Sequence, residues 1–583
     1  MWNFLKRFHD PGEPTSPTSA PPGEFLREFV SDGYVLQVDE SRQTLKIHAE
    51  DDPAWEPNEL SPTLSSLQKR IYSEKFTSAS ALAYKAKQFD DGLYAAVDLA
   101  AQYGAGKYPG KISLLSELSR LLLSGRFHGE MSALLFAAAR LGNIPVEEPA
   151  TMQSDVTLHI QRFLADENAS KVLGFYTWTQ ELTQVFQQDR MLQSAVRDLR
   201  AVQEIAHTLH QCEGALATYV GYLTLLSRLT NPLAAADLRN LVGEGPWHFF
   251  PPSRAYETDL ATQLYGSTQI PEGFSLVQEM VQRIRDGRLS VKPSDKSGWY
   301  DYQTWALESL VLPERTPETT KLTLSKEYRE HLLELFKGVI ALTRETHVKQ
   351  LDICLAGAAL PPKRPRKEIF VCPSLSLEPL GTFYGRRAIA YRFIFEVLLD
   401  TFGPDGLKNI HRMTPQGPME LPLEDEVEQM IALFRGAHAC VNRQLALPPN
   451  DVLPQLPGLA AAMSTFQNWA NEVEKDPDLG RDTRMMVPVF YDVERKKNKV
   501  WVVLGWAKRP LIISYVTPPT VQVKDANGRP ADNDVDIQFS FQYEFAAYPI
   551  SAEVYVKRLL NREEFQKHCD RYGTTEEILA NLT

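Results

Sequence analysis

Cysteine is scarce in this sequence, and no two cysteines form a recognisable pair. The five residues are odd in number, scattered along the chain and never in a CxxC spacing. This pattern predicts neither a disulfide framework nor a cysteine-rich zinc site, and it is typical of a reducing compartment. We therefore expect a cytoplasmic protein without a bound metal ion or cofactor. The cysteines are Cys212, Cys354, Cys372, Cys440 and Cys569.

Long apolar runs and linear catalytic motifs are also missing. No run approaches the roughly 18–20 residues that span a bilayer, so no transmembrane segment is predicted. The N-terminus has no secretory signal, because Lys6, Arg7 and His9 interrupt its apolar residues. Gly-x-Ser-x-Gly, His-Glu-x-x-His and Gly-x-Gly-x-x-Gly do not occur. Catalytic residues can still converge from distant positions, so these absences do not exclude an enzyme.

The sequence has fewer basic than acidic residues: it contains 62 Lys and Arg and 74 Asp and Glu, which gives a net charge of −12. Such a balance argues against a surface that binds nucleic acid broadly, and we expect no strong nucleic-acid signal. Local clusters remain, so a binder of anionic polymers is our second alternative function. The clusters are Lys363, Arg364, Arg366 and Lys367; Arg386, Arg387 and Arg392; and Arg495, Lys496, Lys497 and Lys499.

The length of 583 residues predicts several domains, since a domain typically has about 100–200 residues. Helical periodicity dominates up to about residue 485, and a β-rich stretch follows. The predicted fold class is a multidomain, predominantly α-helical body with a C-terminal β-rich (α+β) module. The expected parts are a flexible peptide and linker at 1–24, a β-hairpin region at 25–60, a helical domain at 61–244, a second mainly helical domain at 245–480, and a β-rich module with two closing helices at 481–583.

Turn and cap residues mark several elements. A hairpin is expected from strands 34–38 and 44–48, and helix starts are expected at Ser61-Pro62, at Thr177 with Gln180, and at Asn231-Pro232. Long helices are predicted over 325–351, 383–402 and 423–442. Strands are predicted near 486–492, 499–505, 510–516, 519–524 and 535–547, which suggests a small sandwich or a partly open barrel. Asn561 and Thr574 or Thr575 begin the closing helices.

Ahead of a linker rich in Pro, Ser and Thr stands a short aromatic and basic peptide. Its apolar side chains suit docking on a partner or contact with a lipid surface, whereas a frayed terminus is the simpler interpretation. The candidate partner-binding residues are Trp2, Phe4, Leu5, Lys6, Arg7 and Phe8. We expect a protein partner, and a membrane-surface contact of this peptide is the weaker alternative.

Two further patterns resemble known sites but lack essential parts. The segment 104–111 has glycines and lysines, yet Ala105 stands where a phosphate loop needs glycine and Ile112 follows the lysine, so a helix–helix connection is predicted. Glu204 and His207 have the spacing of a di-iron motif, which needs a second such motif. No other histidine has a glutamate three residues before it, so no metal site is predicted.

The densest candidate site lies in an aromatic segment before the long helix at 325–351. Candidate ligand-binding residues are Trp299, Tyr300, Tyr302 and Trp305, and candidate catalytic residues are His347, Glu345 and Asp301. Rings supply buried area, tyrosine and indole groups orient polar ligands, and His347 can act as an acid or base. The alternative is that this stripe of rings fills a core, since Trp299, Tyr302 and Ala306 share one helical face.

The flexible N-terminal peptide, the long helical body and the lack of catalytic spacing favour a cytoplasmic protein-interaction or scaffold protein. An enzyme with a pocket around Trp299–Trp305 and His347 is the first alternative. Rings buried in a tight core would speak against that enzyme, whereas a cleft uniting them with His347 would support it.

Overall fold

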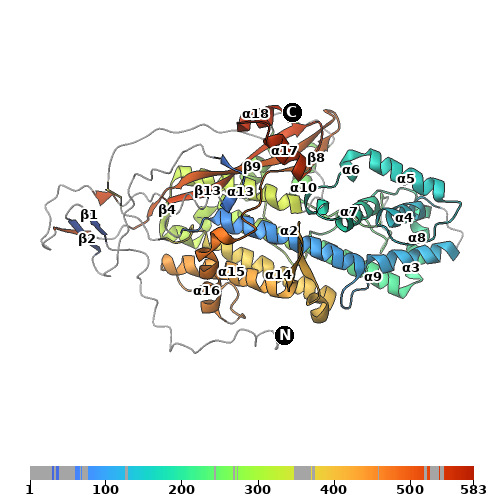
Figure 1. Ribbon diagram of the computed structural model, residues 1–583, viewed down its shortest axis with the longest axis horizontal. Coiled ribbons are helices and arrows are strands. Elements are labelled where there is room, and N and C mark those ends of the chain that lie inside the picture. Colours follow the sequence, from blue (N-terminus) through green and yellow to red (C-terminus); the bar gives the residue numbers. More distant parts are fainter. Residues whose placement is uncertain are drawn as a thin grey trace.

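A computed structural model shows an elongated, mainly helical molecule with strands along one side (Figure 1). No helix in the described part of the chain is long and apolar enough to cross a membrane. The structure describes residues 29–31, 34–38, 60–65, 67, 76–124, 129–239, 241, 245–266, 270–271, 274–346, 369–370, 375–456, 458–517, 521–525, 537–538 and 544–582.

Helix α2 (Ala79–Tyr103) is the central element of the fold. Its alanine-rich sequence favours a helix, and small side chains let neighbours pack on every side. Helices α3, α7 and α13 and strands β6 and β13 all contact it. The helix ends at Gly104, and the turn to α3 contains Gly106 with a φ of +52°. A Cβ at Gly106 would lie 2.0 Å from the Phe402 carbonyl oxygen, so only glycine fits this connection.

The helices after α2 fall into two groups. One group forms an arm around the C-terminal half of α2: α3 (Lys111–Ser124), α4 (Glu130–Leu141), α5 (Gln153–Ala165), α6 (Glu167–Ser170), α7 (Gln180–Leu192), α8 (Leu199–His210) and α9 (Glu213–Leu229) (Figure 1). The other comprises α10 (Tyr256–Tyr265), α11 (Leu276–Arg285), α12 (Trp299–Val311), α13 (Lys326–Thr346), α14 (Gly381–Leu407), α15 (Leu423–Gln444) and α16 (Leu459–Asn471).

The main sheet is antiparallel and is built around the long strand β9 (Lys497–Leu511). Strand β13 (Glu544–Val556) pairs along one edge of β9, while β8 (Met485–Asp492) and β3 (Leu60–Ser61) share the other edge. Helix α13 packs against β13, β9 and β8. Helices α17 (Arg562–Cys569) and α18 (Thr575–Ala580) close the chain. The described strands therefore form a sheet on helices, in place of the predicted sandwich or barrel.

Four small sheets complete the described strands, and all but the local hairpin β6–β7 join distant parts of the chain. They are β1 (Phe29–Ser31), β2 (Tyr34–Val38) and β11 (Val521–Asp525) in the order β1-β2-β11; β4 (Leu322–Leu324) with β10 (Ile513–Tyr515); β5 (Ile369–Phe370) with β12 (Ile537–Gln538); and β6 (His411–Thr414) with β7 (Gly417–Pro422).

The predicted fold class, an α-helical body with a C-terminal β-rich module, is confirmed. Several local predictions were wrong, because tertiary pairing outweighed turn signals. Strand β2 pairs with β1 and β11, and the segment 44–48 that was expected to complete its hairpin lies outside the described residues. Ser61 lies in β3, Thr179 and not Thr177 caps α7, and no helix begins at Asn231. The final strand runs over Glu544–Val556.

One apolar core runs through the described residues, from Leu64 near the start to Ile578 near the end. It includes the inner faces of α2, α13, α14 and α15 together with β8, β9 and β13. The predicted domain boundaries stay a prediction, and contacts of α2 with β13 cross the last two of the four.

Candidate functional site: the buried ionic networks of helix α2

Helix α2 carries charged side chains into the centre of the molecule. Lys87, Asp90, Asp91 and Asp98 are each no more than 3% exposed. Burying a charge is costly unless the group is paired and hydrogen-bonded, so each of these residues demands a partner from another element. Charged and polar side chains from distant segments of the chain therefore meet at this helix.

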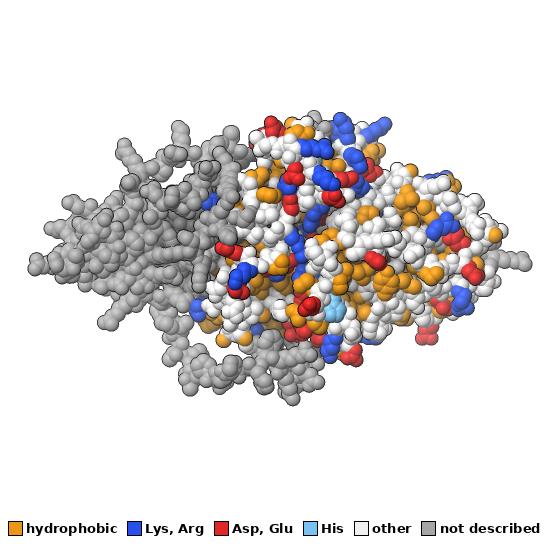
Figure 2. Space-filling model, viewed as in Figure 1, with side chains coloured by type: hydrophobic (Ala, Val, Ile, Leu, Met, Phe, Trp, Pro, Cys, Tyr) orange, Lys and Arg blue, Asp and Glu red, His pale blue; other side chains and the backbone are white. Residues whose placement is uncertain are grey.

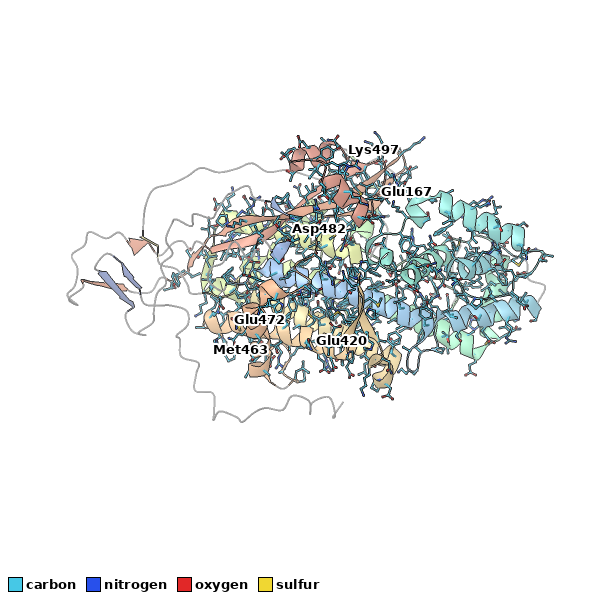
Figure 3. The ribbon with its side chains drawn as sticks, viewed as in Figure 1. Glu167, Glu420, Met463, Glu472, Asp482 and Lys497 are labelled. Carbon is cyan, nitrogen blue, oxygen red and sulfur yellow. The ribbon has the colours of Figure 1, made fainter. Side chains whose placement is uncertain are left out.

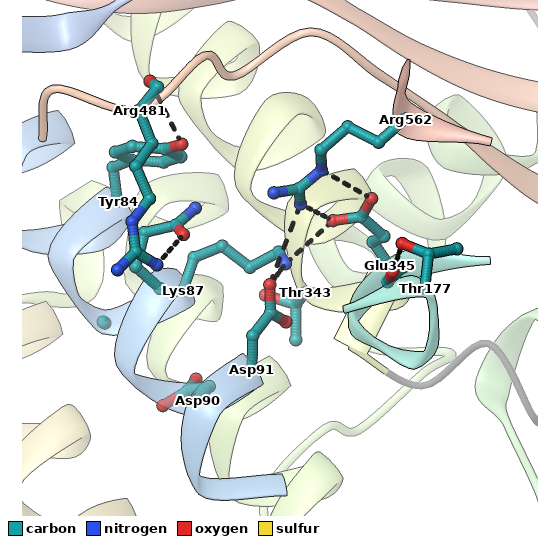
Figure 4. A network of polar contacts seen from close by, with 12 residues as sticks. Tyr84, Lys87, Asp90, Asp91, Thr177, Thr343, Glu345, Arg481 and Arg562 are labelled. Carbon is teal, nitrogen blue, oxygen red and sulfur yellow. Dashed lines mark hydrogen bonds and ion pairs between the residues drawn. The ribbon is translucent and has the colours of Figure 1, made fainter. Parts of the chain in front are cut away.

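The first network joins Lys87 and Asp91 with Glu345 of α13 and Arg562 of α17 (Figure 4). The Lys87 ammonium contacts Asp91 one helical turn away and lies 2.9 Å from Glu345 Oε2. Arg562 holds both Glu345 oxygens, with Nε 3.2 Å from Oε1, and its guanidinium lies 3.8 Å from Asp91. Two cations thus face two carboxylates.

The pKa values of the two carboxylates in this network are shifted in opposite directions. Burial alone raises the pKa of both, because it disfavours the charged form. For Glu345 the attraction of Arg562 and Lys87 outweighs burial and lowers the pKa to about 2. For Asp91 burial wins despite Lys87, and the pKa is raised. Nearby, burial also raises the pKa of Tyr84. Glu345 is therefore the firmly ionised partner of both cations.

The second network is centred on Asp90, on another face of α2. Gln303 of α12 donates to Asp90 Oδ2 over 2.8 Å, and Arg387 of α14 donates to the same oxygen over 2.9 Å. Tyr391 donates to Oδ1 over 2.8 Å. Asp90 thus receives donors on both oxygens, which fixes α12 and α14 against α2.

A third buried carboxylate, Glu378, holds the start of α2. It accepts hydrogen bonds from the Ala79 backbone N–H at 2.8 Å, from Tyr328 at 2.9 Å and from Tyr548 at 2.6 Å. Burial raises its pKa, and the three donors oppose that shift. Because Tyr328 lies on α13 and Tyr548 on β13, this one side chain links the helical body to the C-terminal sheet.

Two of the three predicted catalytic residues, Glu345 and Asp301, lie in the described part of the chain and make different polar contacts. Glu345 enters the first network, as above. Asp301 is 9% exposed and accepts a hydrogen bond from Ser297 Oγ at 2.5 Å, and burial raises its pKa. His347 lies outside the described residues. Arg344, next to Glu345, instead pairs with Glu257, to which Tyr300 donates over 3.1 Å. Successive residues of α13 therefore serve two separate networks.

The predicted aromatic residues all lie on α12 and pack against neighbours. Trp299 and Tyr300 are 0% exposed, and the Arg344 guanidinium stands 3.6 Å above the Tyr300 ring. Tyr302 stacks on a phenylalanine of α14 at 4.3 Å, and Trp305 lies under Arg386 at 4.5 Å. A ligand would reach Trp299 or Tyr300 only if the core opened. The candidate peptide Trp2–Phe8 lies outside the described residues.

The networks are closed within the protein. In the first two networks each charged member has an intramolecular partner of opposite sign, whereas Glu378 is held by neutral donors. The Arg562 side chain is the most exposed part of the first network, at 16%. Among the described residues, no group of three or more His, Cys, Asp and Glu side chains is arranged to hold a metal ion. Such an arrangement stabilises a fold and leaves no charge over for a substrate.

The sequence patterns did not single out Lys87, Asp91 or Arg562. A signal was present, since Lys87 and Asp91 interrupt an alanine-rich helix at the i, i+4 spacing of a helical ion pair. Nothing in the sequence connects them to Arg562, which lies more than 450 residues further along the chain.

Comparisons with known proteins add no relative: no family model, no curated protein and no solved structure matches this chain.

Proposed function

We propose that this chain is a cytoplasmic protein-interaction or scaffold protein. One observation carries the proposal: large apolar side chains are exposed together on the helical arm, while the charged groups of the interior are engaged with one another. The arm holds four of the ten exposed large hydrophobic residues among those described, namely Leu123, Leu158, Leu164 and Leu199, and Tyr103 at the end of α2 is a fifth. Figure 2 shows hydrophobic side chains across this end of the molecule.

Helix α5 is the clearest docking element of this arm. It buries only Val156 and Phe163, and its main helical contacts are α4 and α6. Leu158 is 42% exposed and Leu164 50%. Apolar positions on the outer side of a surface helix supply the anchors that insert into a partner's groove. The fixed networks of α2 support a scaffold, because they hold such a surface in one position relative to the rest of the chain.

The two alternatives receive less support. An enzyme at Trp299–Trp305 would need an opening in the core around Trp299. A binder of anionic polymers would use the predicted basic clusters, yet in the cluster at 386–392 Arg386 pairs with Glu308, Arg387 with Asp90 and Arg392 with Glu396. The cytoplasmic location is supported by the odd number and the scattered spacing of the five cysteines.

The test is affinity capture of the full chain from its native cell, with quantification of what co-purifies. We expect a stoichiometric partner for the native chain and at least a tenfold loss of it for Leu158→Glu/Leu164→Glu. The matched control is Leu421→Glu, because Leu421 is 45% exposed but lies in β7, away from the arm. Absence of a partner from the native chain, or equal loss with the control variant, would contradict the proposal.

A further inference from the structure

One end of the main sheet concentrates cations whose charge is not neutralised by an ion pair. The β8–β9 turn contributes Lys496 and the first residue of β9, Lys497, which lies at the outer end of this hairpin (Figure 3). Strand β13 ends at Val556 opposite Asn498. Continued by one residue, this register sets Lys557 opposite Lys497. None of the three lysines lies within 4 Å of a carboxylate among the described residues.

Like charges directly opposite in an antiparallel pair destabilise the sheet. On its other side Lys497 faces Asp492 of β8, but Arg495 pairs with that carboxylate, so this end of the sheet keeps a surplus of positive charge. The turn contains few acidic residues, and one of them is already in an ion pair. Asp492 pairs with Arg495, and Glu494 is the single further acid of the turn. In Figure 2 Lys and Arg side chains are numerous over this C-terminal part of the molecule, with Asp and Glu side chains among them.

The same turn exposes apolar surface. Val493 is 75% exposed, the largest value among the exposed hydrophobic side chains of the described residues, and Tyr491 is 37% exposed. Both stand within a few residues of Lys496. An exposed branched apolar side chain in the same turn as Lys496 and Lys497, with Tyr491 nearby in the chain, combines attraction to anionic headgroups with a group suited to the acyl boundary.

The turn is held in a fixed shape. Asp492 Oδ1 accepts from the Arg495 backbone N–H at 2.9 Å, and Asp492 Oδ2 accepts from Tyr555 at 3.2 Å. Arg495 also donates to the Ile270 carbonyl oxygen over 3.1 Å. Because these bonds tie the turn to β13 and to a distant loop, Val493 and the lysines are presented together without an ordering cost on binding.

From these observations we infer that the end of the sheet formed by Tyr491, Val493, Lys496, Lys497 and Lys557 binds the surface of a bilayer that contains anionic phospholipid. An anionic surface attracts this basic tip, although the net charge of the whole chain is −12. A lipid surface fits better than nucleic acid, because a nucleic-acid groove uses several rings for stacking and the tip offers one tyrosine and a valine. Basic residues near such a surface act additively, so three lysines give reversible binding.

The experiment is vesicle sedimentation of the full chain, with vesicles of phosphatidylcholine alone or with about a third phosphatidylserine. We expect binding to the anionic vesicles only, weakened by salt. Lys496→Glu/Lys497→Glu/Lys557→Glu should lower the partition coefficient at least tenfold, and Val493→Asp should lower it several-fold. The matched control is Lys292→Glu/Lys296→Glu/Lys408→Glu, which makes the same change of charge at exposed positions elsewhere.

Three results would overturn this inference. They are no binding of the native chain to anionic vesicles, equal loss in the tip and control variants, and unchanged binding by the tip variant, as expected if the N-terminal peptide alone binds. A tip variant that loses binding to a single-stranded oligonucleotide, while vesicles bind neither chain, would assign the tip to nucleic acid. Because the protein partner is assayed through α5, failure here leaves the proposed scaffold function untouched.

Discussion

At the scale of single residues, the environment of each buried carboxylate decides its ionisation. Glu345 has two cations within reach and is held ionised, with a pKa of about 2. Glu553 on β13 is also buried, but its hydrogen bond comes from the neutral indole of Trp501, at 2.9 Å. Desolvation therefore dominates, against the weaker effects of Lys499 and Trp501, and raises the Glu553 pKa to about 8.

Glu553 should make the protein less stable as pH rises. The folded state keeps a proton that the unfolded chain loses near its ordinary pKa of 4.5, so the stability contributed by the protonated group is lost as pH rises from 4.5 to 8. Glu553→Gln keeps an acceptor for Trp501 and cannot ionise. We expect the free energy of unfolding, measured by urea denaturation, to be roughly 1–3 kcal/mol larger for the variant than for the native chain at pH 8.5. At pH 5.5 the difference should be much smaller. An unchanged difference between the two pH values would contradict this.

Arg562 should be the residue whose loss damages the first network most. Arg562→Met leaves Lys87 as the sole cation beside Asp91 and Glu345, and an uncompensated buried charge costs about 3–5 kcal/mol. Arg558→Met is the control, since Arg558 is 65% exposed and its ion pairs are worth at most about 1 kcal/mol. Denaturation midpoints at pH 7 measure both variants.

The pH dependence of the Arg562→Met effect checks its electrostatic origin. In the native chain the depressed pKa of Glu345 contributes stability above pH 4.5, and this contribution is lost as pH falls toward 2. Without Arg562 the carboxylate protonates more readily, so the gap between native chain and variant should shrink between pH 7 and pH 4. A gap that stays constant would point to lost packing instead of charge.

At the scale of elements, the cap of α17 positions Arg562. Asn561 accepts from the Glu564 N–H at 2.9 Å, and the Glu564 side chain accepts from the Asn561 N–H at 2.8 Å. Asn561→Ala removes half of this capping box, at a cost of about 0.5–2 kcal/mol. We expect faster amide exchange over α17 and a lower denaturation midpoint. Asn471→Ala, at an exposed position at the end of α16, should change neither.

Elements with strong local signals were predictable from the sequence. Helices α15, α17 and α18 begin close to where their acids or caps predicted. Local signals do not reveal strand partners that are distant in the chain. Strand β2 pairs with β11 nearly 500 residues away, and Ser61 lies in β3, which pairs with β9. For the candidate site, Glu345 was singled out, but Lys87 and Arg562 were not. Their pairing depends on the packing of α2, α13 and α17, which no spacing in the sequence encodes.

At the scale of the whole molecule, the C-terminal sheet is bonded into the helical body. Ser80 of α2 donates to the Ala547 carbonyl oxygen, and Glu378 links α2 with Tyr548. A Cβ at Gly338 of α13 would lie 2.1 Å from Pro549 Cγ, so helix and strand approach as closely as glycine permits. These contacts lie across the predicted domain boundary at residues 480 and 481.

A chain ending at residue 480 tests that boundary. If the sheet and the helices share one core, truncation exposes the apolar sides of α2 and α13, leaves Tyr328 as the only side-chain donor to Glu378 and removes Arg562 from Glu345. We then expect the full chain to melt in a single calorimetric transition, and the truncated chain to show helical circular dichroism without a cooperative transition. A truncated chain that melts cooperatively near the temperature of the full chain would instead establish residues 481–583 as a separate module, and the ion pair between Glu345 and Arg562 as an interdomain contact.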